Sequence, residues 1–247
     1  MKLLIVSPNS SNLYQDLSDK HSAIEPNIWA GLLANSVRKN CDVSIYDMEV
    51  ERPTLEQFYD VCRGSRADLI LFVVTGQNPN ASSAAMSGAT RASKSIWDNG
   101  WGSGKIAFVG PHVNALPVET LERHPEIDIV LTNEGVYALR NLVSKGTSSE
   151  ALRTINGIAY RDKDEIILNP AERIVPQDRL QEDLPGVAYD LMPPLSKYRT
   201  SGWHANYIEE DRSPFASIYT SLGCIFKCNF CMINQINRTN NDPTATA

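Results

Sequence analysis

The sequence predicts an α/β fold built on a doubly wound parallel sheet, and two observations carry this prediction. Short apolar runs alternate with longer helical patterns through the first 150 residues, which is the element order of a parallel α/β sheet. The runs are nearly continuous in Ile, Leu, Val and Phe, as strands buried on both faces are. We therefore expect a central sheet with helices on both faces.

The elements of this sheet follow one another in order. Strands are predicted at 2–8, 42–48, 67–76, 105–112 and 127–135. Helices are predicted near 26–39, 54–63, 81–97, 117–124 and 135–145. In the first helix the apolar half is expected to face the sheet, and its basic end suits the negative end of the helix dipole.

The rhythm changes after residue 150. The stretch "INGIAYRDKDEIILNP" (155–170) predicts a hairpin of two short strands around a polar turn. Residues 171–213 are punctuated by Pro and Gly and have weak periodicity, which indicates a linker with short ordered pieces. A further strand is predicted over 214–224. The expected organisation is a sheet domain (1–150), a hairpin and linker (151–213) and the start of another domain (214–247).

Composition excludes several classes of function. The chain has 247 residues, a formal net charge of −6 and no basic cluster, which disfavours a nucleic-acid partner. No apolar run approaches the roughly 20 residues that span a bilayer. The start "MKLLIVSPNSS" lacks the apolar stretch of a secretory signal, and the five cysteines do not form a disulfide pattern. A cytoplasmic location is expected.

Three of the five cysteines lie within eight positions. Cys224, Cys228 and Cys231 form C-x3-C-x2-C, and thiolates on one short loop can converge on a single soft metal centre. A four-iron cubane held by three thiolates keeps one iron open for a chelating substrate. A structural zinc site is the alternative, but it needs a fourth ligand, and the nearest histidine is His204, twenty residues upstream. Incidental clustering of buried cysteines is the third interpretation. We favour the open cluster.

This motif, with the aromatic Phe230 directly before its last cysteine, resembles the signature of radical S-adenosylmethionine (SAM) enzymes. The resemblance implies that Cys224, Cys228 and Cys231 ligate a [4Fe-4S] cluster and that the open iron chelates SAM, with Phe230 near the adenine. It also implies an electron donor such as flavodoxin or ferredoxin. Reductive cleavage of SAM would then give a radical that abstracts hydrogen from a small-molecule substrate.

The N-terminal part carries a second resemblance. Its element order, with "IEPNIWAGLLA", "VGPHVNALP" and "TNEGVYALRNLV", is similar over about 1–145 to the cobalamin-binding domain that precedes many radical SAM domains. The whole chain follows the layout of cobalamin-dependent radical SAM proteins, which include anaerobic magnesium-protoporphyrin cyclases and methyltransferases. The resemblance implies a flavodoxin-like sheet that binds cobalamin at its strand ends. The implied contacts are Thr75, Gly76, Gly110, His112, Glu134 and Gly135.

The sequence departs from the cobalamin pattern at two points. Asp19 and His21 begin the cobalt-binding motif D-x-H-x-x-G, but Ile24 stands where its glycine belongs, so His21 is expected to be a solvated loop residue. Val109-Gly110 keeps only one of the two glycines that would let the nucleotide tail of the cofactor pass close to the backbone.

Each implied contact also has a purely structural interpretation. Thr75-Gly76 fits a plain strand-to-loop turn, and His112 fits a residue that hydrogen-bonds its own turn. Glu134-Gly135 fits the start of the following helix, which we favour over a ligand contact.

The leading functional hypothesis is the N-terminal part of a radical SAM enzyme that performs methyl transfer, cyclisation or rearrangement. About 30 residues follow residue 214, whereas the catalytic (β/α) barrel of this family needs on the order of 200. We therefore expect a C-terminally truncated chain that holds only the first strand and the cluster loop of the barrel and is inactive alone. The alternative hypothesis is a non-catalytic, flavodoxin-like binding or sensor module whose cysteine loop binds zinc or is vestigial. An iron–sulfur electron carrier is a weaker third, because no fourth cysteine lies nearby.

Overall fold

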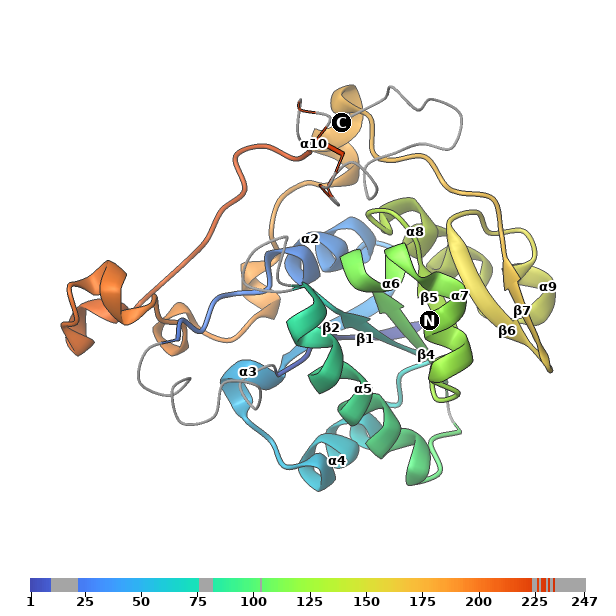
Figure 1. Ribbon diagram of the computed structural model, residues 1–247, viewed down its shortest axis with the longest axis horizontal. Helices are drawn as coiled ribbons and strands as arrows, with labels where there is room; N and C mark the ends of the chain where they lie inside the picture. Colours follow the sequence, from blue (N-terminus) through green and yellow to red (C-terminus); the bar gives the residue numbers. More distant parts are fainter. Residues whose placement is uncertain are drawn as a thin grey trace.

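A central sheet organises the computed structural model, which describes residues 1–9, 22–75, 82–102, 104–223, 226, 228, 229, 231 and 233. Within these residues the sheet has seven strands in the order β2-β1-β3-β4-β5-β6-β7 (Figure 1). The strands are β1 (Lys2–Ser7), β2 (Asp42–Asp47), β3 (Leu69–Val73), β4 (Lys105–Val109), β5 (Ile129–Leu131), β6 (Ile158–Asp162) and β7 (Glu165–Leu168). The first five strands pair in parallel, which confirms the predicted parallel α/β sheet.

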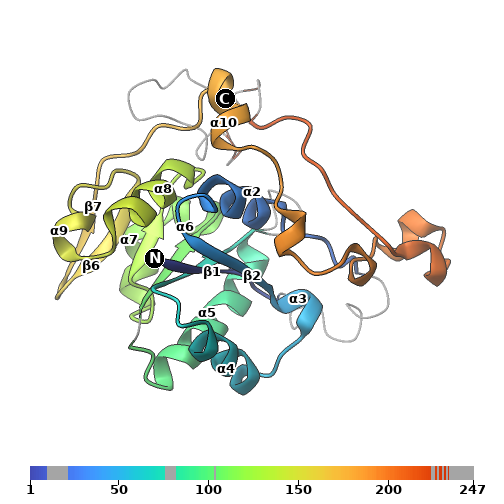
Figure 2. The same ribbon diagram turned by 180° about the vertical axis from the view of Figure 1, so that it is seen from behind.

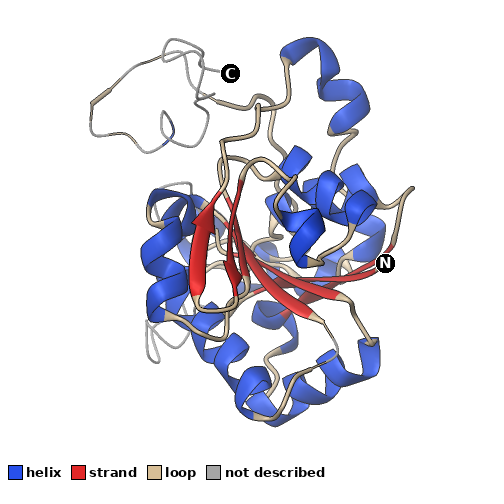
Figure 3. Ribbon diagram, turned by 90° about the vertical axis from the view of Figure 1, so that its right-hand side faces the viewer, coloured by secondary structure: helices blue, strands red, loops and turns tan. Residues whose placement is uncertain are grey.

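Helices cover both faces of the sheet, as Figure 3 shows from the side. They are α2 (Ile28–Val37), α3 (Met48–Glu51), α4 (Leu55–Ser65), α5 (Ser82–Asp98), α6 (Pro111–Ala115), α7 (Pro117–Arg123), α8 (Val136–Lys145), α9 (Ser149–Leu152) and α10 (Leu180–Asp183). The helices predicted between the strands are confirmed to within a few residues at each end.

Alternation along the strands builds two apolar layers. In β1, Leu3 and Ile5 pack with the apolar residues of α2 and α8, whereas Leu4 and Val6 point to the opposite face and pack with α4 and α5. Each of these four side chains is at most 3% exposed. Burial of an aliphatic side chain of this size contributes about 1.5–3 kcal/mol, so both faces of the sheet are needed to stabilise it.

The turn after β4 depends on Gly110. Its φ is +146°, and a Cβ atom there would lie 2.1 Å from the carbonyl oxygen of Val74, which follows β3. Only glycine allows the two chain segments to approach so closely. The backbone at the ends of β3 and β4 is therefore packed without side chains between them.

The predicted hairpin is confirmed and extends the sheet. β6 pairs antiparallel with β5, and β7 pairs antiparallel with β6. Ile158, Ala159 and Tyr160 are fully buried, so the first strand of the hairpin has the apolar character of the interior. The sheet thus continues without a break from β5 into the hairpin.

Residues 171–219, which we call the strap, return along the carboxyl edge of the sheet (Figure 2). Near its start the Val175 N–H donates to the Glu134 carboxylate after β5. Later the Tyr198 hydroxyl donates to Asp47 at the end of β2, with 2.9 Å between the oxygens. The strap contains α10 and several 3-10 turns, so the predicted linker with short ordered pieces is confirmed as local structure, and it is bonded to α2 and to the loop before α2 as well as to Glu134 and Asp47.

The strand predicted over 214–224 is not formed in residues 214–223. A strand needs a neighbour that pairs with its backbone. Here the Phe215 N–H donates to the carbonyl of Leu195, and the carbonyl of Ser217 accepts from the Tyr189 hydroxyl, so these groups bond to turns of the strap. The predicted first barrel strand is not confirmed. In the described part of the chain, no helix is both long and apolar enough to cross a bilayer.

Candidate functional site

The strand order places a topological switch point between β1 and β3. From β1 the chain runs through α2 to β2 on one side, and then crosses to β3 on the other side of β1. In open α/β sheets ligands bind in the crevice outside the carboxyl ends of the strands at such a point. The candidate site therefore lies where β1 and β3 end.

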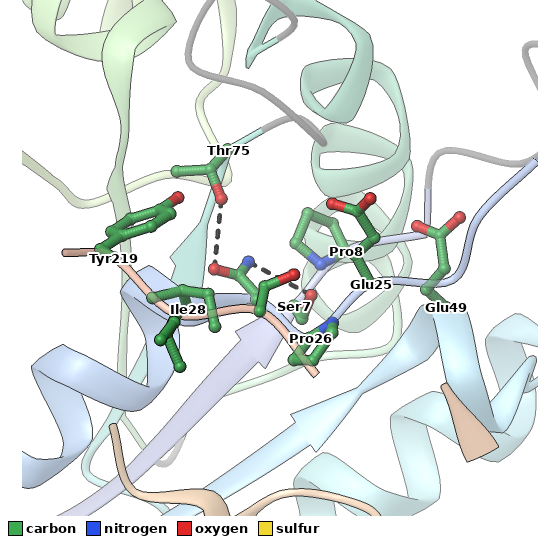
Figure 4. A pocket seen from close by; sticks show the side chains of 11 residues that line it. Ser7, Pro8, Glu25, Pro26, Ile28, Glu49, Thr75 and Tyr219 are labelled. Atoms are coloured by element: carbon green, nitrogen blue, oxygen red, sulfur yellow. Dashed lines mark hydrogen bonds between the residues drawn. The ribbon is translucent and has the colours of Figure 1, made fainter. Parts of the chain in front are cut away.

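A pocket of about 280 Å³ opens at this position (Figure 4). It is lined by Ser7, Pro8, Glu25, Pro26, Asn27, Ile28, Glu49, Thr75, Ser217, Ile218 and Tyr219. We call it the switch-point pocket. Strand ends, helix starts and the last residues of the strap form its walls, so it brings together segments that lie up to about 210 residues apart. Its volume is near the lower end for small-molecule sites, which suits part of a ligand.

Asn27 organises the floor of the pocket. Its Oδ1 accepts from the Ala30 N–H at 3.1 Å, which caps the N-terminus of α2. Its Nδ2 donates to Ser7 Oγ, and its Oδ1 accepts from Thr75 Oγ1, each at 3.2 Å. One side chain thus cross-links the ends of β1 and β3 to the start of α2; the dashed lines in Figure 4 mark its bonds to Ser7 and Thr75.

Two carboxylates make the pocket acidic. Glu25 and Glu49 lie toward one end of it, and Thr75 and Tyr219 lie toward the other (Figure 4). None of the described lining residues is Lys, Arg or His. Burial raises the pKa of Glu25 above its ordinary value, and the charge of His204 partly offsets this rise. Burial and the charge of Glu25 also raise the pKa of Tyr219.

Asp47 holds the backbone of Glu49 at its end of the pocket. It is 2% exposed, and its Oδ1 accepts from the Glu49 N–H at 3.0 Å, which caps the short helix α3. Its Oδ2 accepts from Tyr198, which is fully buried. Burial raises the pKa of Asp47 to about 6, although the hydrogen bonds from Tyr198 and the backbone work in the opposite direction.

Four of the predicted contacts gather at the ends of β4 and β5. Gly110 caps α6, and His112 lies half-buried in that short helix. Gly135 caps α8 with φ +75°, and Glu134 precedes it, so the predicted helix start is confirmed. The buried Glu134 carboxylate accepts from the Val175 N–H, and burial raises its pKa to about 7. Whether any of these residues touches a ligand stays a prediction.

The predicted cluster loop is described in part. Cys228 is exposed and Cys231 is half-buried, and the Cys231 N–H donates to the Cys228 carbonyl at 3.1 Å, so both thiols belong to one turn. Cys224 and Phe230 lie outside the described residues, as do Gly76 and His21. No group of three His, Cys, Asp or Glu side chains that could hold a metal occurs within the described ranges. The three-thiolate site stays a prediction.

Sequence reasoning missed Asn27, Glu25 and Asp47. Asn27 stands directly before the apolar run of α2, and an asparagine in that position is a recognised start signal for a helix. Asp47 similarly precedes α3. Glu25 carries no local signal, because its significance comes from the strap residue Tyr219 and the end of β3.

Comparison with known proteins gives two relatives that are named as methyltransferases. No protein-family model matches the chain. The sequence is 26% identical over 234 residues to the uncharacterized methyltransferase PH0819 of Pyrococcus horikoshii, which covers 94% of this chain and 45% of that protein. It is 27% identical over 123 residues to the cobalamin-dependent radical SAM methyltransferase TokK of Streptomyces tokunonensis, which covers 49% of this chain and 17% of that protein.

Solved structures share the fold. The cobalamin-dependent SAM radical enzyme OxsB, with aqua-cobalamin and SAM bound, aligns with a TM-score of 0.56 and 24% identity over 77% of this chain and 24% of that one. The radical SAM methyltransferase TsrM of Kitasatospora setae, with cobalamin and a [4Fe-4S] cluster bound, aligns with a TM-score of 0.51 and 14% identity over 71% of this chain and 30% of that one.

This chain therefore spans less than half the length of each of these proteins. The predicted resemblance is confirmed: the chain is similar in sequence to the cobalamin-dependent radical SAM methyltransferase TokK, and in fold to the cobalamin-dependent SAM radical enzyme OxsB and the radical SAM methyltransferase TsrM.

Proposed function

We propose that this chain supplies the cobalamin-binding part, and the start of the cluster-binding part, of a radical SAM enzyme that transfers methyl groups. One observation carries the proposal. The strap residues Ser217–Tyr219, which close the switch-point pocket, lead within five residues into the C-x3-C-x2-C motif. The sheet edge that would bind the cofactor and the loop that would bind the cluster are thus joined by one short stretch of chain.

The donor set at the switch point fits a corrinoid. A corrin ring carries primary amides around its rim, and the hydroxyls of Ser7 and Thr75, which Asn27 holds in place, present hydrogen-bonding groups at the pocket. The pocket volume of about 280 Å³ admits an amide side chain and a little more, so the ring itself would lie above the edge of the sheet. Thr75 would contact this rim directly.

The donor set of the cysteine turn fits an iron–sulfur cluster. Thiolates are the ligands that such clusters take, and Cys228 and Cys231 lie on one accessible turn. Cys224 would complete the set, and Phe230 would lie by the adenine of SAM. When bound, these groups supply reductive cleavage of SAM and a carrier for the methyl group.

The residues after β3, β4 and β5 have different proposed roles. Gly110 has no side chain, so a cofactor could approach the backbone there. Gly76 and His112 would contact the same cofactor. Glu134 and Gly135 fix the start of α8 and the entry of the strap, and Glu134 would reach a ligand only after releasing Val175. The proposed partners are a small-molecule substrate and an electron donor such as flavodoxin or ferredoxin. A reducing cytoplasm would keep the thiols available.

Anaerobic reconstitution with iron and sulfide tests the cluster. We expect a reduced [4Fe-4S]⁺ EPR signal that changes shape when SAM is added. The signal should be lost in Cys228→Ala and kept in Cys41→Ala, whose cysteine is half-buried at the far end of the chain. Bound zinc without any cluster would contradict the radical SAM proposal and favour the binding-module alternative.

Titration with hydroxocobalamin, followed by visible absorbance and equilibrium dialysis, tests the proposed binding of cobalamin. We expect saturable binding of one cobalamin per chain. Absence of binding by the folded protein would contradict a cobalamin-binding role, whatever the cysteine loop does.

A further inference from the structure

The switch-point pocket has a marked charge preference. Glu25 and Glu49 both line it, and no positively charged side chain does so among the described residues. The charge of His204 acts on Glu25 and lowers its pKa, and the carboxylate of Glu25 in turn raises the pKa of Tyr219. A ligand group that enters this pocket meets acceptors and negative charge.

Glu25 is the group in the pocket that most needs a partner. Its side chain is half-buried, and it makes no hydrogen bond or ion pair with the described residues within bonding distance. A partly desolvated carboxylate without a donor is costly, so a ligand N–H that donates to it gains a charge-assisted hydrogen bond. The carboxylate of Glu25 lies on the pocket in Figure 4, where such a donor would arrive.

The ordinary anion site of such a fold is partly occupied here. Phosphates commonly bind the free N–H groups at a helix N-terminus beside the sheet. At the start of α2 the Ala30 N–H donates to the Asn27 side chain, and the Gly31 N–H donates to the Asn27 carbonyl. Two of the first four N–H groups of this helix are therefore already bonded, and the charge of Glu25 disfavours an anion beside them.

We propose that Glu25 makes the switch-point pocket a site for a neutral N–H donor, which in a corrinoid is a primary amide of the ring rim. The phosphate of the nucleotide loop would lie elsewhere on the edge. This inference rests on the proposed function, and it makes Glu25 a residue that determines which corrinoids bind.

The test compares hydroxocobalamin with its monocarboxylic acids, in which one rim amide has been hydrolysed to a carboxylate. The replacement of a charge-assisted hydrogen bond by repulsion should weaken binding by tenfold or more. We expect the wild-type chain to bind at least one of the monocarboxylic acids about tenfold more weakly than hydroxocobalamin. In Glu25→Gln and in the double variant Glu25→Gln/Glu49→Gln this preference should shrink to about threefold or less.

Glu165→Gln is the matched control, because Glu165 is exposed on β7 at the other end of the sheet. It should leave the preference unchanged. The inference is overturned if every monocarboxylic acid binds the wild-type chain as tightly as hydroxocobalamin, or if the preference survives in both glutamine variants. If hydroxocobalamin itself does not bind, the proposed function fails together with the inference. The wild-type comparison needs no variant, so the result does not depend on how the variants fold.

Discussion

Removing the hydroxyl of Tyr198 tests how the strap is held on the sheet. Tyr198 is fully buried, Asp47 is 2% exposed, and the hydroxyl of one donates to the carboxylate of the other. Tyr198→Phe keeps the ring and removes only this donor. The loss of stability therefore reports the hydrogen bond, and its size depends on whether the carboxyl of Asp47 is charged.

The pH dependence follows from the pKa of Asp47, which burial raises from 3.8 to about 6. The folded protein holds this proton more tightly than the unfolded chain does. The tighter binding of this proton therefore contributes about 3 kcal/mol to the free energy of unfolding below pH 3.8, and this contribution is lost as the pH rises through about 6. The Tyr198 hydroxyl lowers this pKa by stabilising the carboxylate, so without it the carboxylate becomes harder to form.

Tyr198→Phe should therefore cost more at high pH than at low pH. A hydrogen bond to a neutral group is worth about 1 kcal/mol and one to a charged group about 1.5–3 kcal/mol. We expect a loss in the free energy of unfolding of about 1 kcal/mol at pH 5 and about 2–3 kcal/mol at pH 8, measured by urea denaturation. Glu134 titrates near pH 7 in both proteins, so its effect cancels in the difference.

The control is Tyr207→Phe, since Tyr207 is 73% exposed and should change stability by less than about 0.5 kcal/mol. Equal losses for Tyr198→Phe at pH 5 and pH 8, or a larger loss at pH 5, would refute the reasoning about Asp47.

Three further predictions concern the sheet edge and the strap. Gly110→Ala should lower the free energy of unfolding by about 3 kcal/mol or more, because the new Cβ would clash with the backbone at Val74. Gly64→Ala in α4, where the new Cβ meets nothing, should raise it by about 0.5–1 kcal/mol. If thermal denaturation found Gly110→Ala as stable as Gly64→Ala, the close packing at the sheet edge would be contradicted. Asn27→Ala should cost about 2 kcal/mol in urea denaturation through the lost helix cap and cross-links, and a cost near zero would argue against its role. Asp183 is 3% exposed and bonded to a tyrosine and two arginines. Asp183→Asn should therefore lower the free energy of unfolding by about 2–3 kcal/mol and expose α10 to limited proteolysis. Unchanged cleavage would show that these bonds do not fix α10.

The sheet was predictable because burial on both faces leaves a local trace. Runs such as "KLLIVSP" and "ADLILFVVTG" are apolar at every position in their centres, and the structure buries β1 and β3 on both sides. The hairpin was predictable for a similar reason, since the turn "RDKDE" separates two short apolar runs. These features depend on residues that are neighbours in the chain.

The strand predicted over 214–224 failed for the opposite reason. Its apolar content resembles that of a strand, but pairing depends on a partner elsewhere, and Phe215 bonds to a turn of the strap instead. The sequence also identified the cysteine motif and Thr75, whose positions are local. It did not identify the residues that surround Thr75 in the pocket, such as Asn27 and Tyr219.

By itself, the sequence determined the strands of the sheet and the longer helices between them, where the thiols lie and which family the chain resembles. Only the tertiary structure decided that β1 and β3 are neighbours, that Asn27 bridges them, and that Glu25 and Tyr219 share a pocket. The physical reason is that periodicity records whether a residue faces the interior, whereas strand order and the path of the strap follow from how all the buried faces fit together.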